Sequence, residues 1–252
     1  MNLSLLMKKQ LILIYNEGVE GTQSYLKGVL EDIKNYRVFF KSIEGGAWND
    51  TEIKIFHKPS VAQVKSYVES VADSDYFLIV FCGHGGSYEG ETILELDCCI
   101  DLPLGELHSW VKHTRNLIIC DCCRVAPEVE PIMESLNTRI RMFSEGGNIS
   151  DRIKARMEYH KAIRATNVKI STIGYAASLG EAAGESSKGG YYSHSLLKAA
   201  SEMAQSADTG VISFLQCHNM ADLRVIKLSN DEQHPEYQAM RLQHQLPFVV
   251  KI

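Results

Sequence analysis

The sequence lacks the features that mark several specialised classes of protein. No apolar run approaches the roughly 18 residues that a membrane-spanning helix needs, and no internal repeat is present. Positive charge is in a minority, because 26 Lys and Arg face 31 Asp and Glu and leave a net charge of −5. These absences argue against a membrane protein, a repeat protein and a protein that binds nucleic acid through a basic surface.

What remains is the composition of an ordinary globular protein. The chain has 252 residues, of which 45% are hydrophobic and 23% are charged, and we expect a single domain spanning 1–252. Lys8 and Lys9 follow the first apolar patch instead of preceding it, which is not typical of a secretory signal peptide. We interpret residues 1–9 as an N-terminal tail and expect a cytoplasmic protein.

The cysteines do not form the even set of a disulfide framework. Their number is odd and two pairs are adjacent in sequence: the seven are Cys82, Cys98, Cys99, Cys120, Cys122, Cys123 and Cys217. In a reducing compartment such cysteines are metal ligands, catalytic groups or buried hydrophobic residues.

Short apolar runs predict the buried strands of a parallel sheet. Strands are predicted at 10–15, 36–43, 76–82, 116–120, 169–176 and 247–252. Helices are predicted at 21–35, 59–73, 104–113, 151–165, 191–205 and 213–228, with a small hairpin at 92–100. The alternation of strands and helices predicts an α/β fold, with helices on both faces of a mostly parallel six-stranded sheet.

Two of the predicted strands end in reactive residues. His84 follows the strand at 76–82, and Cys123 follows the strand at 116–120. The carboxyl ends of parallel strands collect ligand chemistry, and a thiol needs a neighbouring base to attack near neutral pH. We therefore predict Cys123 as a nucleophile, His84 as its base, and the amides of Gly85 and Cys123 as an oxyanion hole. Residue types alone are equally compatible with a loop-capping histidine and a buried cysteine.

The two residues lie in the segments FLIVFCGHGG at 77–86 and LIICDCCRV at 117–125. These segments resemble those of the caspase and metacaspase clan of cysteine peptidases. Asp-Cys-Cys at 121–123 matches the start of the metacaspase signature Asp-Cys-Cys-His-Ser-Gly, and Cys-Arg at 123–124 matches the caspase signature Gln-Ala-Cys-Arg-Gly. Residues 178–193 are similar to the Ser…Glu-x-Ala-x-Glu…Gly-x-Phe-Thr pattern of bacterial members. The resemblance implies a caspase-like α/β/α sandwich and a cysteine endopeptidase, although Arg124-Val125 departs from His-Ser-Gly.

The resemblance also implies a charged specificity pocket. Metacaspases, which cleave after Arg or Lys, carry Asp two residues before the nucleophile, and caspases, which cleave after Asp, carry Gln there. Asp121 holds this position, and Glu20 stands near the place where caspases carry Arg. Both acids favour substrates with a basic P1 residue, and Ser178 is a third pocket candidate. The alternatives are a strand-end hydrogen bond for Asp121, a solvated charge for Glu20 and a plain loop serine for Ser178.

Regulation and cofactors are implied in outline only. We interpret 124–168 as an insertion after the cysteine and a candidate regulatory or processing loop, because it carries Arg139, Arg141 and other basic residues; an ordinary charged helix is the alternative. The resemblance implies protein substrates and activation by an upstream protease or regulator in a stress or defence pathway. The acidic net charge and the short apolar runs argue against a nucleic-acid or membrane partner. No cofactor and no metal ligand are assigned. The acidic stretch at 89–101 is a candidate calcium site, since some metacaspases require calcium, but its spacing is not diagnostic and favours a solvated acidic edge.

Two other functions stay open. Cys82, His84, Cys120, Cys122 and Cys123 could supply ligands to zinc, although their spacing is not the usual Cys-x-x-Cys. The chain could also be a catalytically inactive caspase-like interaction module. The presence of both His84 and Cys123 argues against that alternative.

Overall fold

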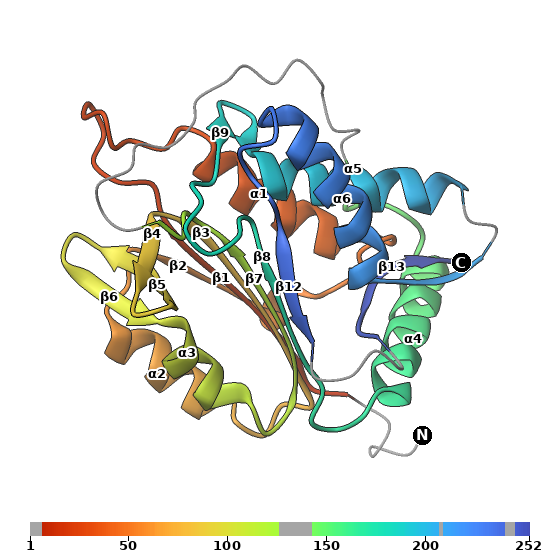
Figure 1. Ribbon diagram of the computed structural model, residues 1–252. Helices are drawn as coiled ribbons and strands as arrows, with labels where there is room; N and C mark the ends of the chain where they lie inside the picture. The colour runs from red at the N-terminus through yellow and green to blue at the C-terminus, as the bar shows by residue number, and fades with distance from the viewer. Residues whose placement is uncertain (1–6, 126–142, 207–208, 240–244) are drawn as a thin grey trace.

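A six-stranded sheet forms the centre of the molecule in the computed structural model, which describes residues 7–125, 143–206, 209–239 and 245–252 (Figure 1). The strand order is β12-β8-β7-β3-β1-β2. Five strands are parallel: β1 (Lys9–Asn16), β2 (Ile53–His57), β3 (Tyr76–Gly83), β7 (Arg115–Asp121) and β8 (Ser171–Tyr175). The edge strand β12 (Glu236–Ala239) runs antiparallel to β8. The predicted six-stranded, mostly parallel sheet is confirmed.

Helices cover both faces of the sheet and make three layers (Figure 1). On one face lie α1 (Val29–Lys41), α4 (Ile149–Ala165), α5 (Tyr191–Ser206) and α6 (Phe214–Leu228), and on the other lie α2 (Val61–Ser70) and α3 (Leu104–Val111). Alternate residues of β1 divide between the two cores, with Leu11 and Leu13 on the first and Ile12 and Ile14 on the second. Burial on both faces explains why the central strands are continuous apolar runs.

Three smaller sheets complete the described fold. β4 (Gly85–Tyr88), β5 (Glu91–Asp97) and β6 (Ile100–Pro103) form an antiparallel sheet directly after β3. β9 (Glu185–Ser186) pairs with β10 (Gly189–Gly190), and β11 (Gly210–Ser213) pairs with β13 (Pro247–Lys251). A short 3-10 helix, η2 (Asp50–Glu52), precedes β2. The predicted hairpin at 92–100 is therefore part of a three-stranded unit.

The second predicted strand, at 36–43, is wrong, because most of this segment belongs to α1. Tyr36, Phe39 and Phe40 are fully buried at helical spacing. Aromatic and β-branched residues favour strands locally, but here tertiary packing of one helical face decides the conformation. The helix predicted at 21–35 begins only at Val29, so residues 17–28 form a loop. The true second strand is β2, a partly exposed edge strand.

The predicted sixth strand, at 247–252, forms β13 but does not join the main sheet. The sixth position is taken by β12, whose sequence EYQA is mostly exposed and gives no apolar signal. The other predicted strands and helices are confirmed within a few residues: these are 10–15, 59–73, 76–82, 104–113, 116–120, 151–165, 169–176, 191–205 and 213–228.

The two expected terminal and regulatory segments are only partly described. Met7 is buried and Lys9 opens β1, so the ordered fold takes in the end of the expected tail. In the segment 124–168, residues 126–142, with Arg139 and Arg141, lie outside the described residues, and much of the remainder forms α4. Arg156 of α4 makes two hydrogen bonds of 2.6 and 2.7 Å to the carboxylate of Glu52. Within the described ranges no helix is long and apolar enough to cross a membrane.

Lys9 places a charged group inside the core. Its side chain is 0% exposed, and its ammonium lies 3.5 Å from the centre of the Trp48 ring and 3.9 Å from Oε2 of Glu52. Nζ has no hydrogen-bond partner among the described residues. Burial lowers the pKa of Lys9 well below its ordinary value.

We expect Lys9→Met to raise the free energy of unfolding by about 1 kcal/mol at pH 7, because an apolar chain of similar length avoids the desolvation of the ammonium. The folded state lowers the pKa of Lys9, so the unfolded chain binds more protons and wild-type stability rises with pH toward the ordinary lysine pKa. The gain from the substitution should therefore shrink as pH rises. Urea denaturation across pH measures both effects, with the exposed Lys8→Met as control. A loss of stability in Lys9→Met would contradict the interpretation.

Candidate active site

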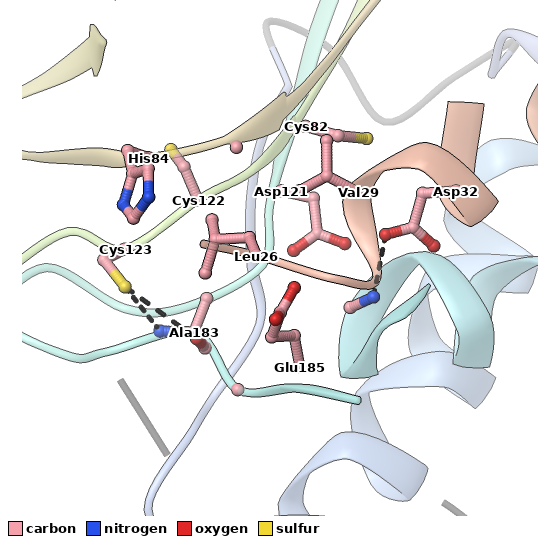
Figure 2. A pocket seen from close by; sticks show the side chains of 13 residues that line it. Leu26, Val29, Asp32, Cys82, His84, Asp121, Cys122, Cys123, Ala183 and Glu185 are labelled. Atoms are coloured by element: carbon pink, nitrogen blue, oxygen red, sulfur yellow. Dashed lines mark hydrogen bonds between the residues drawn. The ribbon is translucent and has the colours of Figure 1, made fainter. Parts of the chain in front are cut away.

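The ends of β3 and β7 bring His84 and Cys123 to one cavity. The two strands are adjacent and parallel, and Cys82 pairs with Asp121 at their carboxyl ends. His84 and Cys123 follow within two residues, and both line a cavity of about 30 Å³ (Figure 2). The structure thus places together the two residues that the strand order predicted would meet.

A backbone carbonyl fixes the orientation of His84. Nε2 of His84 lies 2.5 Å from the carbonyl oxygen of Ser24. A carbonyl only accepts, so Nε2 carries a proton, and Nδ1 is the ring nitrogen that remains to accept one. Sequence analysis missed Ser24, because it treated residues 21–35 as a helix.

The loop that carries Ser24 leaves no room for a side chain at Gly18. A Cβ on Gly18 would lie 2.4 Å from the Ser24 carbonyl oxygen and 2.8 Å from Nε2 of His84, and the φ angle of +77° favours glycine. Lys58 holds the same turn, since its Nζ donates to the Gly18 carbonyl at 2.6 Å and lies 3.4 Å from the carboxylate of Glu17. The position of Gly18 therefore controls the position of the His84 ring.

The Cys123 thiol rests against the backbone of Ala183. The Ala183 amide donates to Sγ at 3.3 Å, and Sγ lies 3.8 Å from the Ala183 carbonyl oxygen (Figure 2). Burial raises the pKa of Cys123, and the hydrogen bond from the Ala183 amide opposes this shift. The resting group is therefore a thiol that needs a base to become a nucleophile.

The neighbouring Cys122 has a different environment. It is buried in the core on the α2 and α3 face, and a Cβ on Gly85 would lie 2.8 Å from its Sγ. Gly85 opens β4 directly after His84, and its lack of a side chain allows β4 to pack against Cys122. Gly85 and Cys123, the predicted oxyanion-hole residues, therefore belong to the two strand ends that carry His84 and the thiol.

Three carboxyl groups line the same cavity: Asp32, Asp121 and Glu185 (Figure 2). Each accepts a backbone hydrogen bond, from Gly190 to Asp32 at 2.7 Å, from Ser193 to Asp121 at 2.9 Å and from Gly28 to Glu185 at 3.2 Å. No lysine or arginine is among the described residues that line the cavity.

The acids are not fully partnered. Oδ1 of Asp32 and Oε1 of Glu185 are buried and have no hydrogen-bond partner in the described parts of the chain. Burial raises the pKa of Asp121, and burial together with the Asp121 charge raises the pKa of Asp32 well above its ordinary value. Burial also raises the pKa of Glu185 to about 7. The site is therefore an acidic cavity, and its three carboxyl groups face no basic side chain among the described lining residues.

The structure does not bring Glu20 and Ser178 to this cavity. Glu20 is exposed in the loop after β1, and Oγ of Ser178 donates to the His234 carbonyl at 3.0 Å. Neither is among the described residues that line the cavity. Asp32 and Glu185 accompany Asp121 instead. The sequence contains a signal for Glu185, because this residue ends the Glu-x-Ala-x-Glu pattern. It contains none for Asp32, because an acidic residue in the first turn of a helix is common.

Arg124, the departure from the metacaspase signature, is buried behind the cysteine. Its Nε donates to Oγ1 of Thr92 at 2.9 Å, and its Nη1 donates to the Ala177 carbonyl at 3.0 Å and to Glu236 at 2.8 Å. Its guanidinium also stacks 4.0 Å from the centre of the Tyr175 ring. Arg124 therefore ties the end of β7 to three neighbouring segments.

The geometry does not support the zinc alternative. Cys82 lies in the core on the α1 and α5 face, whereas Cys120 and Cys122 lie in the core on the opposite face of the sheet. In the part of the chain that is described, no group of three or more His, Cys, Asp or Glu side chains is placed to hold a metal ion, and this includes the candidate calcium stretch at 89–101.

The fold is that of caspases. Caspase-1 from Spodoptera frugiperda superposes with a TM-score of 0.62 over 97% of this chain and 91% of its own, at 12% identity. Protein GSU0716 from Geobacter sulfurreducens superposes with a TM-score of 0.59 over 97% of this chain and all of its own, at 14% identity. At such identities the similarity establishes the architecture.

The family follows from the sequence model. The chain belongs to the caspase domain family, whose model matches residues 8–247. This is a family of cysteine peptidases, and peptidases act on protein substrates. A comparison with curated proteins finds no match.

Gly18→Ala should lower the rate at which iodoacetamide alkylates Cys123 at pH 7 by tenfold or more, because the new methyl group displaces the Ser24 carbonyl and the His84 ring. Quantitative mass spectrometry of the Cys123 peptide measures this rate separately from other thiols. Gly21→Ala is the matched control, since Gly21 also has a positive φ angle, +84°, but a Cβ there meets nothing within 4 Å. Equal slowing in both variants would contradict a specific role for the Gly18 contact.

Proposed function

We propose that this protein is a cysteine endopeptidase that cleaves after Arg or Lys, with Cys123 as nucleophile and His84 as general base. The observation that carries the proposed specificity is the acidic cavity beside Cys123, in which two buried carboxyl oxygens accept no hydrogen bond from the described residues. The family membership supports the proposed reaction class.

The proposed reaction uses the free Nδ1 of His84 twice. Nδ1 takes the thiol proton of Cys123, and the sulfur attacks the scissile carbonyl carbon. The carbonyl electron pair moves to oxygen, where the amides of Gly85 and Cys123 would stabilise the negative charge. The C–N bond then breaks, and Nδ1 returns the proton to the leaving amine. In the second half of the reaction Nδ1 takes a proton from water, the water oxygen attacks the acyl carbon, and the proton returns to Sγ as the C–S bond breaks. The Ser24 carbonyl would stabilise the protonated ring through Nε2.

A cationic P1 side chain supplies what the acidic cavity lacks. Its N–H groups would donate to the open oxygens of Asp32 and Glu185 and would favour the ionised form of all three acids. A planar guanidinium can bind a carboxylate through two parallel hydrogen bonds, which favours Arg over Lys. An aspartate at P1 would add a fourth negative charge to the same cavity, and this strongly disfavours cleavage after acids.

The cavity must widen to admit such a side chain. Its volume of about 30 Å³ is that of roughly one water molecule. Leu26 lies between the Cys123 side chain and the acids in Figure 2, and it belongs to the same loop as Ser24 and Gly28. We infer that substrate entry displaces Leu26.

We extend the proposal to the cellular setting on the family resemblance alone. The protein would act in the cytoplasm as one domain and would be switched on by an upstream protease or regulator in a stress or defence response. All seven cysteines are free, which suits a reducing compartment. The segment 124–168 remains the proposed regulatory or processing loop.

Hydrolysis of matched fluorogenic peptides ending in Arg, Lys or Asp tests the proposal directly. We expect cleavage after Arg and Lys, with or without calcium, and loss of cleavage to background in Cys123→Ala, because the thiol forms the covalent intermediate. A peptidyl-arginine chloromethyl ketone should label Cys123 in the wild-type chain. Cleavage after Asp would retain the peptidase and contradict the pocket assignment. An absence of both hydrolysis and labelling would favour the inactive interaction module.

The acidic cavity also predicts a pH dependence. The KM for an Arg substrate should fall as pH rises through about 7, because Glu185, whose pKa burial raises to about 7, becomes ionised and binds the guanidinium more tightly. Glu185→Gln should raise KM about tenfold or more at pH 8, and KM should then no longer fall as pH rises through about 7. The exposed Glu20→Gln is the control and should match the wild type. An unchanged KM profile in Glu185→Gln would show that Glu185 does not bind the P1 side chain.

A further inference from the structure

Two adjacent cysteines form an exposed hairpin turn far from the thiol of Cys123 in sequence. Cys98 and Cys99 connect β5 to β6, and they are the exposed members of the seven cysteines, all of which are described. Cysteine is among the most often buried residues, and its free thiol is generally avoided on surfaces. Two of them at the tip of one turn are therefore unusual.

The backbone of the turn is also unusual for cysteine. Cys99 has a φ angle of +62°, the left-handed conformation that tight hairpin turns usually fill with Gly or Asn. Oδ1 of Asp97 accepts a hydrogen bond of 2.8 Å from the backbone amide of Cys98, and this bond stabilises the start of the turn. As a result the two side chains lie on the same side, with their sulfur atoms 3.6 Å apart.

This separation suits a bridging atom better than a disulfide. Adjacent Cα atoms are about 3.8 Å apart across a trans peptide, below the roughly 4.4–6.8 Å that disulfides usually span, so a direct S–S bond here would be strained. Two sulfur atoms bound at about 2.3 Å to one pyramidal or tetrahedral centre lie about 3.3–3.8 Å apart. The observed 3.6 Å is close to this bite.

The other adjacent pair, Cys122 and Cys123, does not have this geometry. Cys122 is buried in the core on the α2 and α3 face, whereas the Cys123 sulfur contacts the backbone of Ala183 on the cavity side. The two sulfur atoms therefore lie on the same side in Cys98 and Cys99 but on different sides in Cys122 and Cys123. The second pair serves as an internal comparison for thiol capture by the first.

We propose that Cys98 and Cys99 form a two-thiol site that captures a single thiophilic centre of the trivalent arsenical class. Monosubstituted trivalent arsenic takes two sulfur ligands, so the pair is sufficient without a third protein ligand. The proposal is independent of the peptidase activity.

The capture step is a condensation without redox change. An arsenic–oxygen double bond breaks, two arsenic–sulfur bonds form, and the oxygen leaves as water with both thiol protons, while arsenic stays trivalent. The neighbouring Cys99 and the acids Asp97 and Glu95 raise the pKa of Cys98, so this thiol keeps its proton near neutral pH. The condensation consumes thiols in their protonated form.

Phenylarsine oxide is the probe. The full chain is incubated with it, washed with excess glutathione and weighed by intact mass spectrometry. We expect one phenylarsenic unit per chain, stable to the monothiol and removed by 2,3-dimercaptopropanol. Cys98→Ser and Cys99→Ser should each lose the adduct, because one thiol cannot hold arsenic against glutathione, whereas Cys123→Ala should keep it.

Cys99→Gly is a control that separates loss of the thiol from loss of the turn conformation. Glycine accepts the positive φ angle of position 99, so this variant should keep the hairpin, with an unchanged circular dichroism spectrum, and still lose the adduct. An adduct that survives in Cys98→Ser or Cys99→Gly, or that disappears in Cys123→Ala, would overturn the proposal. A wild-type chain that holds no adduct against glutathione would overturn it as well.

Discussion

The parallel pairing of β3 with β7 is the constraint on which the candidate site depends. Because the two strands are adjacent and in register from Tyr76 opposite Arg115 to Cys82 opposite Asp121, their carboxyl ends lie at one edge of the sheet. The pairing of these two strands is therefore enough to place His84 and Cys123 at the same edge of the sheet. Burial of both faces of the sheet fixes this register, since a slip of one residue would turn apolar side chains out of both cores. Core packing therefore determines the distance between the proposed base and the proposed nucleophile.

The loop at 17–28 connects the proposed base with the proposed specificity pocket. Its Ser24 carbonyl orients His84, its Leu26 lines the same cavity as the acids, and its Gly28 amide donates to Glu185. A movement of this loop would change the base and the pocket together. Burying three carboxyl groups in one cavity is unfavourable, and their raised pKa values express that cost. On the proposed function, part of this cost is relieved when a basic side chain binds.

Sequence patterns predicted the elements whose local preference agrees with their packing. The apolar runs of β1, β3 and β7 and the capped, amphipathic α2 and α6 are of this kind. The failures have two physical causes. Residues 36–43 have local strand propensity but complete the buried face of α1, and β12 is an exposed edge strand without an apolar signal. Both depend on partners that are distant in the chain, and periodicity within a short window does not contain them.

For the site, the sequence by itself determined which residues can do chemistry and which strand ends carry them. It led to the prediction of His84, Cys123 and Asp121 as site residues, because strand order and the motifs around them are local properties. Only the tertiary structure decided what surrounds them: Ser24 beside His84, Ala183 beside the thiol, and Asp32 and Glu185 in place of Glu20 and Ser178. The physical reason is that backbone carbonyls, amides and buried charges act through distances between remote segments, and those distances are fixed by packing of the whole core.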